Sequence, residues 1–200
     1  MSLLDKATIL KFHKDRIEEF GKGEVEALGW KAKENQLARF EVLAELTDFS
    51  GKSVLDIGCG HGDLFPFLLE RFPTISYKGL DQMEDFLETA SNRYIAYPQA
   101  RFLWGDFWQA DLPPSDIVIA CGALSYRHSD PAFLHKMIKK LFSYAKEAFA
   151  FTLLSKVKDT EGLLVAYEAA AVYDYCRKIC PNAVLKKDYR SDDFAVFMYK

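Results

Sequence analysis

From residue 53 onward, short apolar runs rich in β-branched and aromatic residues alternate with segments whose apolar residues recur three or four positions apart. The runs are "SVLDIG", "SYKGLD", "RFLWGD", "DIVIAC" and "AFAFTLL", and the helical segments cover residues 64–72, 83–94, 131–144 and 161–179. Strands that alternate with helices are typical of a parallel sheet with helices on both faces. The pattern therefore predicts a doubly wound, Rossmann-like α/β sheet.

The two last runs of the chain break this alternation. Only "RSD" separates "AVLKKDY" from "DFAVFMYK", which is too short for a crossover helix and predicts an antiparallel hairpin. Phe194 to Tyr199 is apolar at every position, as in a strand covered on both faces, whereas Lys186 and Lys187 suit an exposed edge. We expect seven strands, mostly parallel, with a reversed C-terminal strand inside the sheet.

The N-terminal segment has helical periodicity only. Leu37, Phe40 and Ala44 exemplify the spacing between residues 3 and 49, and Gly21, Gly23 and Gly29 interrupt it, which predicts two or three short helices. No linker follows them. We expect a single domain over residues 1–200, with a helical cap (1–50) on a sheet domain (51–200).

Composition and charge indicate which partners the chain is expected to lack. The chain is 50% hydrophobic, 28% charged and carries a formal net charge of -3 without a basic block, which disfavours nucleic acid as a partner. Its apolar stretches are too short to span a bilayer, and its first residues lack a signal-peptide core, so we expect no membrane partner and a cytoplasmic location.

The four cysteines have no spacing typical of a zinc or redox site, and we expect no metal. Cys176 and Cys180 fall four apart on a predicted helix and therefore share a face. Because free cysteine behaves as a small hydrophobic residue, we interpret both as buried thiols.

The stretch "VLDIGCGHGDL", Val54 to Leu64, is a strand that ends in a glycine turn and opens a helix. Such a turn lets backbone approach a ligand, and the helix N-terminus adds free N–H groups. The dinucleotide fingerprint needs glycine where Asp63 stands, and no Lys-Ser or Lys-Thr follows as in a P-loop. Asp56 would repel a pyrophosphate and stabilise an ammonium or sulfonium group, so the loop favours a positively charged ligand.

At these residues the chain resembles the class I S-adenosylmethionine-dependent methyltransferases, whose first motif "VLDIGCGHG" matches at every position. The resemblance implies that the methionine half of the cofactor S-adenosyl-L-methionine is wrapped by Asp56, Gly58, Cys59, Gly60 and Gly62.

Later motifs of that family also have counterparts. Asp81 in "YKGLDQM" ends the second strand, where the family binds the ribose hydroxyls through two carboxylate oxygens. The resemblance further implies adenosine contacts from Gln82, Met83, Asp106 and Phe107, and a cofactor wall formed by Cys121, Gly122 and Ala123. Taken singly, Asp81 and Asp106 can also be ordinary turn residues.

The methyl acceptor is expected over the carboxyl ends of the first and fourth strands, beside residues 120–130. His128 can serve as a general base or be a solvated loop histidine, and Tyr126 can be a base or a pocket wall. His61 can face the cofactor or point outward. Arg39 lies one helical turn from Gln36 and suits the cofactor carboxylate, although surface solvation explains both residues equally well.

We therefore expect an enzyme that transfers a methyl group from S-adenosylmethionine to a small molecule. The N/D-P-P-Y/F sequence that the family uses to methylate bases and amides is absent after the fourth strand. Two alternatives stay open, a non-catalytic S-adenosylmethionine-binding module of the same fold and a nicotinamide-dependent oxidoreductase.

Overall fold

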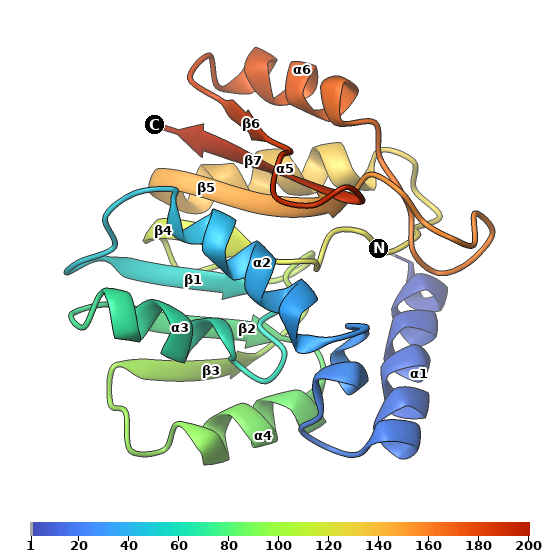
Figure 1. Cartoon of the computed structure of the whole chain (residues 1–200), viewed down its shortest axis with the longest axis vertical. Helices are drawn as coiled ribbons and strands as arrows, with labels where there is room; N and C mark the ends of the chain where they lie inside the picture. The colour runs from blue at the N-terminus through green and yellow to red at the C-terminus, as the bar shows by residue number, and fades with distance from the viewer. Residues whose placement is uncertain (1) are drawn as a thin grey trace.

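The computed structural model describes residues 2–200 and contains one seven-stranded sheet in the order β3-β2-β1-β4-β5-β7-β6 (Figure 1). The strands are β1 (Ser53–Ile57), β2 (Ser76–Asp81), β3 (Ala100–Trp104), β4 (Ser115–Ala120), β5 (Ala145–Leu154), β6 (Val184–Lys186) and β7 (Asp193–Tyr199). The helices are α1 (Leu3–Phe20), the 3-10 helix η1 (Val25–Leu28), α2 (Lys33–Ala44), α3 (Leu64–Arg71), α4 (Glu84–Arg93), α5 (Phe133–Tyr144) and α6 (Ala169–Ile179).

The first five strands are parallel, and β7 runs antiparallel to both β5 and β6. The doubly wound sheet with a reversed final strand is therefore confirmed. From Asp193 to Met198 every residue of β7 is buried, as its continuous apolar pattern indicated, and β6 forms the sheet edge. The edge strand is only three residues long, shorter than the seven-residue run that predicted it.

Helices cover both faces of the sheet, because each presents an apolar stripe toward the strands. Phe40 and Leu43 of α2 and Phe65 of α3 pack in one buried cluster with Val54, Tyr77, Ile117 and Phe197. On the other face, α5 and α6 bury Met137, Ile138, Leu141, Val172 and Cys176 against alternate residues of the same strands. In Figure 1, α2 and α3 lie in front of the sheet and α5 behind it.

The predicted helix over residues 161–179 was wrong in its first half, because α6 begins only at Ala169. Residues 160–164, which precede α6, are fixed by contacts with residues 126 and 127 after β4. Arg127 donates from Nε to the Gly162 carbonyl (2.9 Å) and from Nη2 to the Thr160 carbonyl (2.6 Å), and Tyr126 forms a β-bridge with Leu164. The Glu168 side chain then accepts the first free N–H groups of α6.

The N-terminal helices stand at the end of the sheet where the parallel strands terminate (Figure 1). α1 extends over 18 residues, so the expectation of short helices was wrong for it, and a capping box between Ser2 and Asp5 stabilises its start. The division into a cap (1–50) and a sheet domain (51–200) stays a prediction. Within residues 2–200 no helix is long and apolar enough to cross a membrane.

Cys176 and Cys180 are buried free thiols, as predicted, and Cys59 and Cys121 are also unpaired.

Candidate functional site

The glycine loop after β1 is fastened to the neighbouring strand β2. The N–H groups of Gly58 and Cys59 donate to the Leu80 carbonyl at 2.8 and 3.1 Å. Gly58, Gly60 and Gly62 have φ angles of 69°, 55° and 74°, a region that residues with a Cβ rarely adopt. A Cβ on Gly58 would stand 2.5 Å from the Cβ of Ala123, so the loop also packs in close contact with the segment after β4.

Asp81 links this loop to the start of α4. One carboxylate oxygen accepts the Gly60 N–H and the other accepts the Met83 N–H, both at 2.9 Å. Burial raises the pKa of Asp81, and the backbone N–H groups of Met83 and Gly60 oppose that shift. Each oxygen retains a lone pair, so the carboxylate can accept two hydrogen bonds from a ligand while it holds the loop.

Asp56 lies on β1 and is 2% exposed. The Tyr77 hydroxyl donates to its Oδ2, but its Oδ1 is buried without a hydrogen-bond partner in the described chain. Burial raises the pKa of Asp56 to about 7, and the negative charges of Asp81 and Asp63 add to the effect. A buried carboxylate with a vacant oxygen fits a ligand that brings a hydrogen-bond donor or positive charge.

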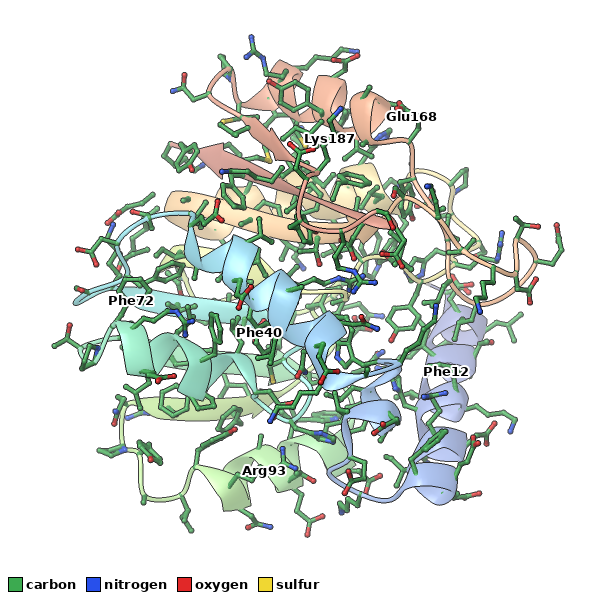
Figure 2. All side chains as sticks on the ribbon, viewed as in Figure 1. Phe12, Phe40, Phe72, Arg93, Glu168 and Lys187 are labelled. Carbon is green, nitrogen blue, oxygen red and sulfur yellow. The ribbon has the colours of Figure 1, made fainter. Side chains whose placement is uncertain are left out.

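A cavity of about 570 Å³ opens above these groups, a volume typical of small-molecule sites. Its floor is the glycine loop and the ends of β2 and β4, and its walls come from α1, η1, α2 and residues 154–164. Figure 2 labels Phe12 on α1 and Phe40 on α2, which both line it. The predicted residues that line the cavity are Arg39, Asp56, Gly58, Cys59, Gly60, Asp81, Gln82, Met83, Phe107, Cys121, Gly122, Tyr126 and His128.

Two further acceptor atoms, one on Gln82 and one on Asp106, are buried without a hydrogen bond in the described part of the chain. Gln82 lines the cavity and leaves Oε1 without a hydrogen bond within residues 2–200. Asp106 accepts the Trp108 N–H at 2.9 Å through Oδ1, while Oδ2 lacks a hydrogen bond and lies 3.6 Å from Lys6 Nζ. At the cavity, Gln82 therefore offers an acceptor to an amino group, and Met83 and Phe107 offer an apolar surface to a ring.

Of the predicted residues, Gly62, His61 and Asp106 do not line the cavity. A Cβ on Gly62 would meet the Phe102 ring at 2.6 Å, so this glycine permits close packing on β3. His61 is fully buried with its ring edge-on to Phe86 at 4.9 Å, and neither ring nitrogen has a partner in the described chain. Burial lowers the pKa of His61 to about 4, so the ring is neutral at pH 7.

Arg39 is buried rather than solvated on the surface. Its guanidinium forms an ion pair with Asp193 at the start of β7 and stacks on Trp30, with Cζ 4.6 Å from the ring centroid. The Tyr189 hydroxyl donates to the other Asp193 oxygen at 2.6 Å. Nη1 of Arg39 faces Gly122, where a Cβ would stand 2.8 Å away. The predicted cofactor ligand thus lies at the cavity with its charge already balanced.

The two acceptor-side candidates differ in their partners. His128 stacks on Phe133 with the ring centroids 3.4 Å apart, and its Nδ1 lies 4.0 Å from Asp5 Oδ2. The ring is buried rather than a solvated loop histidine, and burial lowers the pKa of His128 to about 4. Tyr126 is hydrogen bonded, with its hydroxyl 2.8 Å from Nε2 of His13.

Two parts of the cavity wall were missed by sequence reasoning. His13 lies on α1 four residues from the buried Ile9, a helical spacing that could have placed it on the inward face. Residues 156–164 line the cavity because they form no helix.

Burial raises the pKa of Cys59 well above its usual value and that of Cys121 to about 12, so both stay protonated and act through their size. Among the described residues, no group of three or more His, Cys, Asp or Glu side chains is arranged to hold a metal ion.

Comparison with known proteins shows that the chain is similar to methyltransferases. Residues 55–144 match the family model described as a methyltransferase domain. The chain is 33% identical over 88 residues to trans-aconitate 2-methyltransferase of Acidovorax, a match that covers 43% of this chain and 33% of that protein. It is 38% identical over 92 residues to a probable ribosomal RNA small subunit methyltransferase A of Methanospirillum hungatei, covering 44% and 34%. The chain thus spans about a third of the length of these curated relatives.

A solved structure is similar over its whole length. Magnesium protoporphyrin IX methyltransferase of Synechocystis, crystallised with bound S-adenosylhomocysteine, superposes with a TM-score of 0.73 at 19% identity. The superposition covers 98% of this chain and 99% of that chain, and it establishes the shared fold.

Proposed function

We propose that this chain, whose residues 55–144 match a methyltransferase domain, is a class I S-adenosylmethionine-dependent methyltransferase that transfers a methyl group from S-adenosylmethionine to a small molecule bound in the cavity. The observation that carries the proposal is Asp81, whose two oxygens hold the glycine loop and the start of α4 and still face the cavity. A carboxylate held in this way suits a vicinal diol, such as the hydroxyl pair of a ribose.

The unpartnered atoms around the cavity fit the rest of the cofactor. Asp56 Oδ1 is a vacant acceptor beside the glycine loop, which suits the cationic methionine half. Gln82 Oε1 is an acceptor at the cavity without a hydrogen bond in the described chain, which suits the amino group of adenine, whereas Asp106 Oδ2 is paired with Lys6 away from the cavity lining. Met83 and Phe107 supply apolar surface there. We assign the cofactor to these residues, with Gly58, Gly60, Cys59, Cys121 and Gly122 as the backbone floor.

When bound, S-adenosylmethionine supplies a methyl group made electrophilic by its sulfonium sulfur. The chain itself has to aim an acceptor and exclude water, because an in-line displacement depends chiefly on orientation. Apolar side chains from residues 1–50, among them Ile9, Phe12 and Trp30, line the cavity and can keep water out. Arg39 is assigned to the wall between Trp30 and Gly122.

Several observations favour a small acceptor over a macromolecule. The space beyond the cofactor residues is enclosed by α1, α2 and residues 154–164, and the chain has a net charge of -3 without a basic block. The Acidovorax relative is named for a small molecule, trans-aconitate, whereas the Methanospirillum relative is named for ribosomal RNA. We therefore propose a small molecule and no nucleic acid.

The test is turnover. The protein is incubated with S-adenosylmethionine carrying a labelled methyl group and fractions of a metabolite extract, and release of S-adenosylhomocysteine is measured together with label in an extracted product. We expect release that depends on one fraction and is lost in Asp81→Ala. Silence across all fractions, from protein that still binds S-adenosylhomocysteine, would identify a non-catalytic cofactor-binding module instead.

A further inference from the structure

A histidine of α1 and a tyrosine from the segment after β4 are hydrogen bonded at the cavity wall. Nε2 of His13 lies 2.8 Å from the Tyr126 hydroxyl, and Nδ1 lies 3.0 Å from the Ala27 carbonyl oxygen. His13 is 6% exposed, and both side chains line the cavity. The two residues are 113 positions apart, so the contact is made only in the fold.

The carbonyl of Ala27 determines which ring nitrogen of His13 carries hydrogen. A carbonyl oxygen can only accept, so Nδ1 must be the donor. In a neutral ring, Nε2 is then a bare acceptor, and the Tyr126 hydroxyl must donate to it. The phenol hydrogen of Tyr126 is therefore turned toward α1.

The surroundings of His13 favour the neutral ring. Phe12 and Phe86 pack edge-on at centroid distances of 5.0 and 5.1 Å. Burial lowers the pKa of His13, and the positive charge of Arg16 on the same helix lowers it further, against the Ala27 hydrogen bond. The other titratable or charged groups toward this pair are His61 from the glycine loop, Asp81 from β2 and Arg39 from α2, whose charge is balanced by Asp193.

The Tyr126 hydroxyl can interact with a ligand in only one direction. With its hydrogen committed to His13, the oxygen has only lone pairs left, so it can accept a hydrogen bond but cannot donate one. A hydroxyl or an N–H group satisfies such an oxygen. A carboxylate brings lone pairs and negative charge toward it and is left unpaired, which costs binding free energy.

We propose that the His13–Tyr126 pair makes this end of the cavity select methyl acceptors that present a hydroxyl or N–H hydrogen and reject those that present a carboxylate. Tyr126 touches the ligand, and His13 is a positioning residue that acts through Tyr126. The inference rests on the proposed function for the identity of the ligand as methyl acceptor. The polarity of the pair itself rests only on the contacts with Ala27 and Tyr126.

The test uses three probes that share one apolar ring, namely phenol, anisole and benzoate. Phenol donates a hydrogen bond, anisole cannot, and benzoate is a carboxylate. Binding of each is measured by NMR titration of the full chain saturated with S-adenosylhomocysteine. We expect phenol to bind roughly tenfold more tightly than either other probe, the difference that one hydrogen bond makes. Benzoate binding as tight as phenol, or no binding of phenol, would overturn the proposal.

Two variants separate polarity from structure. His13→Gln keeps an oxygen that can accept from Tyr126, so the preference for phenol should persist. His13→Leu frees the Tyr126 hydroxyl to donate, so the preference should shift roughly tenfold toward benzoate. An unchanged ratio in His13→Leu, or an effect of the variants on S-adenosylhomocysteine affinity instead of on probe affinity, contradicts the assignment of Tyr126 to the acceptor.

A measurement without ligand tests the polarity of the His13–Tyr126 pair independently of the proposed function. In protein labelled with nitrogen-15 at histidine, the His13 ring should show a protonated Nδ1 and a bare, hydrogen-bonded Nε2 at pH 7, and Tyr126→Phe should move the Nε2 signal. The opposite tautomer, or a charged ring, refutes the polarity whether or not S-adenosylhomocysteine binds. Absence of S-adenosylhomocysteine binding with the expected tautomer refutes the proposed function alone.

Discussion

Gly60 donates its backbone N–H to the carboxylate of Asp81 across 2.9 Å, so the glycine loop after β1 and the acidic end of β2 form one unit. The second oxygen of Asp81 holds Met83 in the same way. A ligand that binds Asp81 therefore meets a carboxylate already fixed in place, which reduces the ordering cost of binding. The loop and the carboxylate should respond together to substitution.

Gly58→Ala should destabilise the fold more than Gly51→Ala. Both glycines have positive φ, at 69° and 72°, which costs an alanine about 1 kcal/mol. The new Cβ at position 58 also stands 2.5 Å from the Ala123 Cβ, whereas no atom of residues 2–200 lies within 4 Å of a Cβ at position 51. We expect an additional loss of about 1 to 3 kcal/mol in Gly58→Ala, measured by urea unfolding. Equal losses in the two variants would show that the loop yields to the clash.

Replacing only one partner of the buried ion pair between Arg39 and Asp193 should lower the free energy of unfolding. Arg39→Met leaves the Asp193 carboxylate buried without its cation, which is expected to lower the free energy of unfolding by about 3 to 5 kcal/mol. The double variant Arg39→Met with Asp193→Leu should recover much of this loss. Lys11→Met, which breaks the exposed pair with Asp15, is the control and should leave the unfolding curve unchanged. A double variant no more stable than Arg39→Met contradicts this account.

Asp56 should make stability fall as pH rises. Its folded pKa is raised to about 7, so between about pH 4 and 7 the folded state holds a proton that the unfolded state has lost. Stability is fully present below the unfolded pKa and declines toward pH 7, by at most about 1.4 kcal/mol per pH unit. Asp56→Asn stays neutral, so its stability relative to the original protein should increase from pH 4 to 8. A difference independent of pH would mean that Asp56 is ionised throughout.

His61 should have the opposite pH dependence. Its folded pKa is lowered to about 4, so between pH 4 and 6.5 the unfolded state binds a proton that the folded state does not, and stability rises with pH. His61→Phe removes this proton and two unpartnered nitrogens, and should stabilise the protein more at pH 5 than at pH 7. His135→Phe on the exposed side of α5 is the matched control.

The same variant tests whether His61 serves the cofactor. Because its ring packs on Phe86 outside the cavity, S-adenosylhomocysteine affinity should stay unchanged in His61→Phe. A loss of affinity would give His61 the direct role that the structure does not support.

The strands were predictable because their signals are local. The run from Phe194 to Tyr199 is apolar throughout, and it forms a strand with partners on both sides. The placement of Asp56 and Asp81 at the cavity was predictable for the same reason, since both lie at or next to the ends of recognisable strands, while their roles toward a cofactor stay predictions.

Contacts between distant residues were not predictable. Residues 161–168 have helical periodicity, but Arg127 holds the carbonyls of Thr160 and Gly162, and Tyr126 bridges to Leu164. No sequence pattern pairs Arg39 with Asp193, which are 154 positions apart, or His13 with Tyr126. Such pairs form only when the folded sheet brings distant segments together. They determine which side chains at the cavity remain free to bind a ligand.

Calorimetric titration of the full chain and of Asp81→Asn with S-adenosylhomocysteine tests whether Asp81 binds the cofactor. The amide of this variant places an NH2 group against the N–H of either Gly60 or Met83. The glycine loop and the side-chain oxygens that would bind the ligand are therefore disturbed together. We predict 1:1 binding to the original protein and an affinity at least roughly tenfold weaker in the variant, with Asp174→Asn on α6 unaffected. Equal binding by Asp81→Asn, or no binding by the original protein, would contradict the account.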